Sequence, residues 1–199
     1  MLYVMSQPEP ANFDATVRQR GLAHLRDNSV GLDNPLPKGV KIPAYWQGCL
    51  DELYDSYGGV CAYLAIHFER IIGGGSVDHF AAKSALPGHA YEWQNYRLAS
   101  SRMNSRKNRY NDVLDPFEVE DGWFRLEMVS GRLYPNPDLE PETLKAVKAT
   151  VTRLKLDDQG CREVRARHFS DYIQGMYTAE FLQRRSPFVW YEANRQGLL

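Results

Sequence analysis

Apolar residues recur at helical spacing in several stretches of this chain. The first clear stretch follows Pro43 and ends before the pair Gly58-Gly59, with apolar positions at Trp46, Cys49, Leu50, Leu53, Tyr54 and Tyr57. Proline is tolerated in a first helical turn and glycine ends helices, so this pattern predicts an amphipathic helix whose aromatic side chains lie in the core. Residues 1–41 carry several prolines and little periodicity apart from a short helix expected over 15–25. They predict an N-terminal arm laid over a single domain of residues 42–199.

The middle of the chain alternates between strand-like and turn-like segments. Residues 61–72 (CAYLAIHFERII) are rich in β-branched and aromatic side chains, and residues 76–80 (SVDHF) follow after three glycines. This pattern predicts two strands joined by a glycine turn. A polar loop leads to another strand candidate in residues 91–99 (YEWQNYRLA), and a short helix is expected over residues 101–109.

The last part of the chain is predicted to be a hairpin followed by helices. The alternating run GWFRLEM and the later run GRLYPNP, within residues 122–137, predict two short strands. Apolar spacing predicts one helix that starts at Pro141 and a second over about 161–176, within a helical part of about 140–199. A final helix is expected from Pro187, with Ser186 as its N-cap. The whole pattern predicts an α+β fold.

Composition indicates a folded protein without a membrane span. The chain has 199 residues, of which 43% are hydrophobic, enough for one ordinary domain with its own core. No apolar run approaches the roughly 18 residues of a membrane span, and the N-terminus lacks a basic start and an apolar centre. The three cysteines are odd in number and far apart, which favours reduced thiols over a disulfide framework. We therefore expect a cytoplasmic protein with no membrane partner.

Candidate chemistry gathers between residues 78 and 109. Hydrolysis of a phosphodiester needs a base for the attacking water and a cation for the developing charge, and the pair Asp78-His79 offers both functions. His79 is the candidate base, because a neutral imidazole is available near pH 7. Asp78 and the amide oxygen of Asn104 would form an oxygen-rich site suited to Mg²⁺, provided that the strand ends at His79 so that both neighbours reach one place.

Basic residues surround this candidate site. The net charge of the chain is −1, but residues 100–111 (SSRMNSRKNRYN) carry four basic residues and no acidic one. This distribution predicts contacts with the phosphate backbone of a nucleic acid, without sequence specificity. A second interpretation leaves the same residues as a solvated face. The candidate phosphate contacts are Lys83, Arg97, Arg102, Arg106, Lys107 and Arg109.

The series Asp78-His79, Asn95 and Asn104, in the order strand, loop, strand and helix, resembles the HNH, or ββα-metal, endonucleases. The resemblance implies that His79 activates water, that Asp78 and Asn104 bind one Mg²⁺ or Mn²⁺, and that Asn95 braces the loop. It also implies a ββα-metal finger over about 61–110, wrapped by α-helices, with an additional short β-hairpin. Asn in place of the last His of the family name resembles the HNH domain of RNA-guided DNA nucleases.

Five blocks extend the resemblance to one branch of the HNH proteins. CAYL, VDHFAAKS, YEWQN, MNSRK and LDPF resemble the blocks CxYC, EHFxPKS, YxWxN, CNxxK and LDP of proteins often encoded beside an ATPase in bacterial anti-phage systems. The resemblance implies an ATPase partner. Such proteins often hold a structural zinc with two Cys pairs, but here those positions read Cys61, Leu64, Ser100 and Met103. One thiolate cannot make a tetrahedral site, so no structural zinc is expected; Ala82 also replaces a proline.

The sequence therefore predicts a metal-dependent HNH endonuclease that hydrolyses DNA, with RNA as the second substrate. An alternative, motivated by the missing zinc ligands, is a catalytically silent subunit that binds nucleic acid or forms a complex. A third hypothesis is an unrelated protein in which the blocks match by chance.

Overall fold

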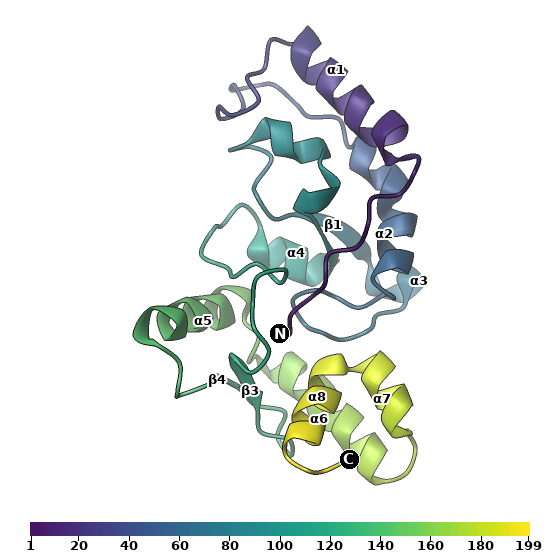
Figure 1. Ribbon diagram of the computed structural model, residues 1–199, viewed down its shortest axis with the longest axis vertical. Coiled ribbons are helices and arrows are strands. Elements are labelled where there is room, and N and C mark those ends of the chain that lie inside the picture. The colour runs from purple at the N-terminus through teal and green to yellow at the C-terminus, as the bar shows by residue number, and fades with distance from the viewer. The chain divides into compact units, whose positions relative to one another are not determined.

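The computed structural model describes residues 1–199, and it describes the burial of each of them except Gly73. The described chain has an α+β fold with eight α-helices and two small antiparallel sheets of two strands each (Figure 1). The predicted fold class is confirmed at this level. The chain forms two compact units, the first from residues 1–5, 60–68 and 112–199, the second from residues 6–59 and 69–111.

The candidate residues all belong to the second unit. Contacts define these units, whereas a domain is defined by independent folding, so the predicted boundary between residues 41 and 42 stays a prediction. None of the described helices combines the length and the apolar character needed to cross a membrane.

The hairpin of β1 and β2, followed by helix α4, is the centre of the second unit. Strand β1 (Gly75–His79) pairs antiparallel with β2 (Tyr96–Ser100), with Asp78 opposite Arg97. Helix α4 (Ser101–Lys107) follows β2 directly, and the hydroxyl of Ser100 accepts a hydrogen bond from the backbone N–H of Met103 at 3.4 Å. This cap stops the strand and starts the helix. The predicted order of strand, loop, strand and helix is confirmed for these elements.

The segment before residue 42 contributes to the core of the second unit. A π-helical turn (η1, Asp14–Arg18) leads into α1 (Gln19–Asp27), and the ring of Phe13 packs edge-on against Trp93 and Tyr96, with centroids 5.5 and 5.7 Å apart. Phe13 is fully buried. The helix predicted after Pro43 is confirmed as a 3₁₀ turn (η2, Tyr45–Cys49) that continues into α2 (Leu50–Ser56).

Two predicted strands differ from the structure. Residues 61–69 form turns, with an isolated bridge between Val60 and His67, and residues 70–73 form the short helix α3 (Arg70–Gly73). Ala65 has a left-handed φ of 49° and its N–H bonds to the carbonyl of Cys61, which closes a turn inside the predicted strand. β-propensity describes a fit to a pleated surface, so it does not make a strand where no partner strand is aligned.

The third strand candidate is shorter than predicted. Residues 87–95 form two 3₁₀ turns, η3 (Pro87–Tyr91) and η4 (Trp93–Asn95), and extended structure begins at Tyr96. Pro87 occupies the first position of η3, where its missing N–H costs no hydrogen bond.

The first unit contains the predicted hairpin and the C-terminal helices. Strand β3 (Phe124–Leu126) pairs with β4 (Leu133–Pro135), which confirms the hairpin. Three of the helices that follow were predicted, and α7 was not. Their bounds are α5 (Pro141–Leu154), α6 (Gln159–Ile173), α7 (Ala179–Arg185) and α8 (Pro187–Arg195).

Ser186 occupies the N-cap position of α8 but does not cap it with its side chain. Its hydroxyl instead forms a hydrogen bond with Nδ1 of His168 on α6, and both residues are buried. The position predicted from the sequence is correct, and the predicted capping bond is not. Buried polar groups are nearly always hydrogen-bonded, and the Ser186 hydroxyl is the partner of the buried imidazole.

Candidate functional site

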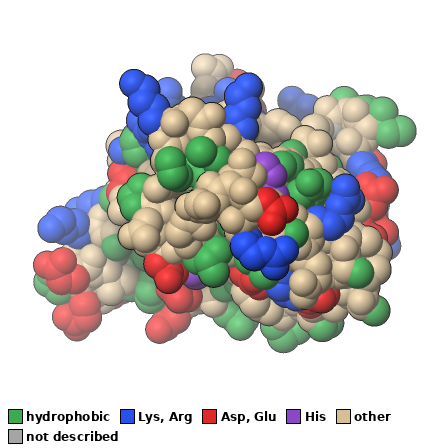
Figure 2. All heavy atoms as spheres, turned by 90° about the horizontal axis from the view of Figure 1, so that it is seen from above, with side chains coloured by type: hydrophobic (Ala, Val, Ile, Leu, Met, Phe, Trp, Pro, Cys, Tyr) green, Lys and Arg blue, Asp and Glu red, His purple; other side chains and the backbone are tan. Residues whose placement is uncertain are grey.

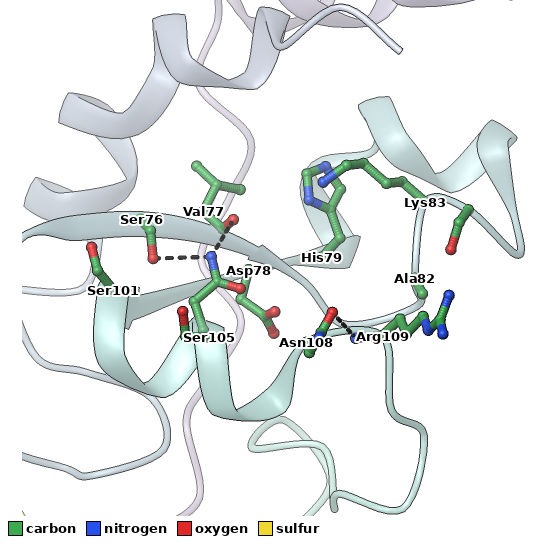
Figure 3. Close-up of a pocket in the computed structure, with 12 residues that line it drawn as sticks. Ser76, Val77, Asp78, His79, Ala82, Lys83, Ser101, Ser105, Asn108 and Arg109 are labelled. Atoms are coloured by element: carbon green, nitrogen blue, oxygen red, sulfur yellow. Dashed lines mark hydrogen bonds between the residues drawn. The ribbon is translucent and has the colours of Figure 1, made fainter. Parts of the chain in front are cut away.

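Three segments of the second unit line an open cavity of about 570 Å³ (Figure 3). They are the end of β1, the loop after it and helix α4, and they bring together the predicted residues Asp78, His79, Lys83, Asn104 and Arg109. Residues that are 31 positions apart in the sequence therefore face one space.

Asp78 and His79 both line this cavity although they are neighbours on one strand. Their side chains extend to different sides of β1, with Asp78 on the side of α4 and His79 beside Lys83 (Figure 3). Strand β1 ends at His79, and the next N–H, of Phe80, bonds to the backbone carbonyl of Asn95 at 2.9 Å. Because the chain turns here, opposite faces of the strand end open onto the same cavity.

The imidazole of His79 has a fixed orientation. Its Nε2 lies 2.9 Å from the carbonyl oxygen of Ala90, and its ring packs edge-on against Trp46 and Tyr96, at centroid distances of 4.5 and 5.1 Å. A carbonyl oxygen can only accept, so Nε2 carries the proton and Nδ1 keeps a free lone pair. Burial, followed by the charge of Lys83, lowers the pKa of His79 to about 3. The ring is therefore neutral near pH 7, as a general base must be, but a pKa so far below 7 also makes it a weaker base than an ordinary imidazole.

Asn104 presents an oxygen with no hydrogen bond from the described residues. Its amide nitrogen donates to the hydroxyl of Ser76 at 3.1 Å and to the carbonyl of Val77 at 3.4 Å. These two bonds fix the amide on β1 and assign its nitrogen and oxygen. The Oδ1 atom remains available as a ligand.

Asp78 lies beside a buried lysine. The Asp78 carboxylate and the Lys107 ammonium are buried, with Oδ2 and Nζ 3.7 Å apart. The ammonium also donates to the backbone carbonyls of His79, at 2.8 Å, and Phe80. Lys107 therefore ties the last turn of α4 to the end of β1.

The prediction that Lys107 and Arg97 contact phosphate is corrected. Lys107 is 0% exposed, and its ammonium donates to carbonyls inside the protein. Arg97 is buried as well, and its Nη1 donates to the carbonyls of Gln94 and Tyr96 at 2.8 and 3.0 Å. Neither side chain reaches the surface that a phosphate backbone would approach.

The other basic candidates remain near the surface. Arg102 and Arg109 on and after α4 are exposed, and Arg106 is half-buried. The ammonium of Lys83 lies 4.8 Å from the centroid of the Trp46 ring, in a cation–π contact. Desolvation lowers the pKa of Lys83, and the charge of Asp78 opposes that shift.

Asn95 fastens the loop between β1 and β2. Its Oδ1 accepts from the N–H of Ala81 at 2.7 Å, and its Nδ2 donates to the carbonyls of Ala81 and His89 at 3.0 and 2.9 Å. These are the contacts that a brace makes. They also fix the residue before Ala90, whose carbonyl holds the imidazole of His79.

The donor atoms at the cavity fit a hard divalent cation. A carboxylate from Asp78 and an amide oxygen from Asn104 are ligands suited to Mg²⁺ or Mn²⁺, which would keep several waters and take phosphate oxygens. Among the described residues, no three His, Cys, Asp or Glu side chains gather into a metal-binding group. At two of the positions that the sequence resemblance matched to zinc ligands of the HNH proteins, Ser100 caps α4 and Met103 is buried in the core.

Two residues near the cavity make contacts that the sequence did not indicate. Trp46 lies in the core, as expected, and its ring also contacts both His79 and Lys83. No sequence signal connects residues 33 positions apart in this way. For Lys107 a signal existed, because it lies four residues after the apolar Met103 and therefore on the same face of α4.

Comparison with known proteins adds no family. No protein-family model matches this sequence, and no curated protein matches it. The resemblance to the HNH endonucleases therefore rests on short sequence blocks, and the family assignment is a proposal.

Proposed function

We propose that this protein is a metal-dependent endonuclease of the HNH, or ββα-metal, type, in which β1, β2 and α4 form the finger. It hydrolyses phosphodiester bonds in DNA, and RNA is the second candidate substrate. One observation carries the proposal: Asp78, His79 and Asn104 line a single cavity, and Nδ1 of His79 and Oδ1 of Asn104 are left as acceptors.

His79 acts as the general base in this proposal. Its neutral imidazole accepts through Nδ1 the proton of a water that attacks the phosphorus, while the carbonyl of Ala90 holds the opposite nitrogen. Asp78 and Asn104 would hold the divalent ion. When bound, that ion supplies positive charge against the phosphate and the leaving oxygen. Asn95 acts as a positioning residue, because its bonds fix the loop that carries the Ala90 carbonyl.

Exposed cations support the choice of a nucleic acid. Arg102 and Arg109 are exposed near the cavity, and Lys83 and Arg109 line it. Acidic and basic side chains are interspersed on the face drawn in Figure 2, so this face carries no extended patch of one charge. The resemblance extends the proposal to an ATPase partner and to a cytoplasmic role in anti-phage defence. Co-purification with the full chain tests the ATPase partner.

The test compares cleavage by the wild type and by His79→Ala. Plasmid, single-stranded DNA and RNA are incubated with Mg²⁺ or Mn²⁺, with EDTA as the metal-free arm. Loss of a general base costs about 10²- to 10⁴-fold in rate, so His79→Ala should cleave at least about 100-fold more slowly. The matched control is His89→Ala, because His89 is exposed and its Asn95 contact uses the backbone carbonyl.

Two results decide this test. Equal cleavage by wild type and His79→Ala, with the fold of both verified by circular dichroism, removes His79 as the base and the HNH assignment with it. Cleavage that persists in EDTA removes the divalent metal.

The second candidate function is a silent subunit that binds nucleic acid. It is favoured by the residues at the zinc positions, where Ser100 and Met103 replace two thiolates and serve as a helix cap and a core side chain. This second function is supported if the protein binds DNA with a salt-dependent affinity and hydrolyses no DNA with any divalent metal.

A further inference from the structure

The charges around the cavity are unusual for a metal site. Of the described residues that line it, Asp78 is acidic, whereas Lys83 and Arg109 are basic. The carboxylate of Asp78 is itself paired at 3.7 Å with the buried ammonium of Lys107. The two basic side chains of the lining and the buried Lys107 ammonium beside Asp78 therefore outnumber the one carboxylate before any ion or substrate arrives.

This balance of charges disfavours the binding of a divalent cation in the absence of a phosphate. Sites for Mg²⁺ usually combine one or two carboxylates with the phosphates of the substrate. Here the single carboxylate is already paired with a lysine, and the Asn104 amide oxygen brings no charge. Like charges at short distance in a partly buried site repel, and solvent screens them less than it does at the surface.

The same balance favours an anion. The Lys83 ammonium is held over the Trp46 ring at 4.8 Å, beside the imidazole of His79 (Figure 3). Hydroxyls of Ser84 and Ser105 add hydrogen-bond donors to the lining, whereas the hydroxyl of Ser101 donates to the carbonyl of Gly74. A phosphodiester carries one negative charge and accepts such bonds, so it complements this cavity without a metal.

We propose that the cavity takes up a phosphodiester of the nucleic acid before the divalent ion, and that Lys83 enforces this order by attracting the phosphate and repelling the free ion. This inference rests on the proposed function. Binding energies are reciprocal, so a phosphate that improves metal binding is itself bound more tightly when the metal is present.

The test measures two affinities for the full chain, neither of which depends on cleavage. Isothermal titration calorimetry gives the affinity for Mn²⁺ without nucleic acid. Fluorescence anisotropy of a labelled 12-base-pair DNA duplex in EDTA gives the affinity for the phosphate backbone without metal. Both are measured for the wild type, Lys83→Gln and Arg102→Gln. Lys83 and Arg102 are both exposed enough for substitution without loss of the core.

The two affinities should change in opposite directions in Lys83→Gln. We expect the affinity for Mn²⁺ to increase about threefold or more. We expect the affinity for the duplex in EDTA to decrease about threefold or more. Coupling between two binding sites typically changes an affinity by about 5- to 150-fold. In the control Arg102→Gln, Mn²⁺ binding stays unchanged and duplex binding weakens slightly, because Arg102 lies outside the cavity lining.

Several outcomes overturn the proposal. These are weaker or unchanged Mn²⁺ binding in Lys83→Gln, no duplex binding by the wild type in EDTA, and no Mn²⁺ binding by either protein. The result remains separable from the proposed function. If the Mn²⁺ and duplex affinities of Lys83→Gln change in opposite directions but the wild type never cleaves, the binding order is supported and the nuclease assignment is refuted. If the wild type cleaves but the two affinities do not change in opposite directions, the nuclease assignment is supported and the binding order is refuted.

Discussion

At the scale of single residues, the pair of Asp78 and Lys107 is the most constrained feature of the candidate site. Lysine is almost never fully buried unless its charge is compensated. Here Lys107 is 0% exposed and donates to the carbonyls of His79 and Phe80 in addition to facing Asp78. The lysine therefore belongs to the architecture of the strand end, and its loss would remove the ammonium that faces a buried carboxylate.

Lys107→Met should be strongly destabilising. Removal of one partner from a buried ion pair costs about 3 to 5 kcal/mol, because the remaining charge stays buried and uncompensated. Urea denaturation followed by circular dichroism measures this loss. The matched control is Lys148→Met on α5, where the side chain is exposed and the expected change lies within about 0.5 kcal/mol.

The double variant Asp78→Asn/Lys107→Met tests the cause. If the cost of Lys107→Met comes from the stranded carboxylate, neutralising Asp78 should recover part of it, and the two effects should not add. Additive losses, or a loss below about 1 kcal/mol for Lys107→Met alone, would contradict the account of a coupled pair.

At the scale of elements, the connection between β3 and β4 is held directly against α6. Gly131 in this connection has φ +69°, and a Cβ built on it would lie 2.1 Å from the carbonyl oxygen of Arg162. Its own carbonyl accepts from Nε of the buried Arg165 at 2.9 Å. Glycine is therefore required here both by the backbone conformation and by the close approach of a helix.

Gly131→Ala should lower the stability of the protein by about 2 to 5 kcal/mol. A left-handed conformation costs an L-residue roughly 1 to 2 kcal/mol, and overpacking adds about 1 to 3 kcal/mol. Gly175→Ala separates the two causes, because Gly175 has φ +76° but no neighbour within 4 Å of a new Cβ. It should lose only the conformational part, and equal losses of melting temperature in the two variants would refute the close approach to α6.

A local sequence pattern is enough to predict some of the helices and strands but not all of them. Helices that begin at Pro141 and Pro187 are predicted correctly because proline and apolar spacing act within the segment. The predicted strand over residues 61–72 is wrong because a strand needs a partner from elsewhere. Ser186 shows the same limit, since the partner of its hydroxyl, His168, lies on another helix.

At the scale of the whole molecule, each compact unit combines distant parts of the chain, so buried polar groups depend on neighbours that the sequence does not place together. His168 in the first unit is an example. It is buried against Ser186, and burial, followed by the charge of Arg185, lowers its pKa to about 4. Asp171 opposes this shift and Arg167 adds to it.

His168 should make stability fall in mild acid. Its folded pKa of about 4 lies below the ordinary value of 6.5, so between these values the unfolded chain binds a proton that the folded chain does not. Its contribution is complete above pH 6.5 and declines as the pH falls toward 4, by about 1 to 3 kcal/mol.

Urea denaturation at several pH values between 7 and 4 measures this decline. In His168→Gln, which stays neutral throughout, the part due to His168 should be absent, so the curves of the two proteins should converge as the pH falls. Parallel curves would show that the imidazole does not change its protonation on unfolding.

The sequence by itself determined the order of strand, loop, strand and helix, the prolines that begin helices, and the residue types that offer a base and oxygen ligands between positions 78 and 104. These follow from local spacing, because periodicity and capping act over a few residues. Only the tertiary structure decided that Asp78, His79 and Asn104 share a cavity and that Lys107 faces inward. Burial, the assignment of hydrogen bonds and the balance of charge depend on groups that meet in space from distant segments, and no spacing along the chain fixes them.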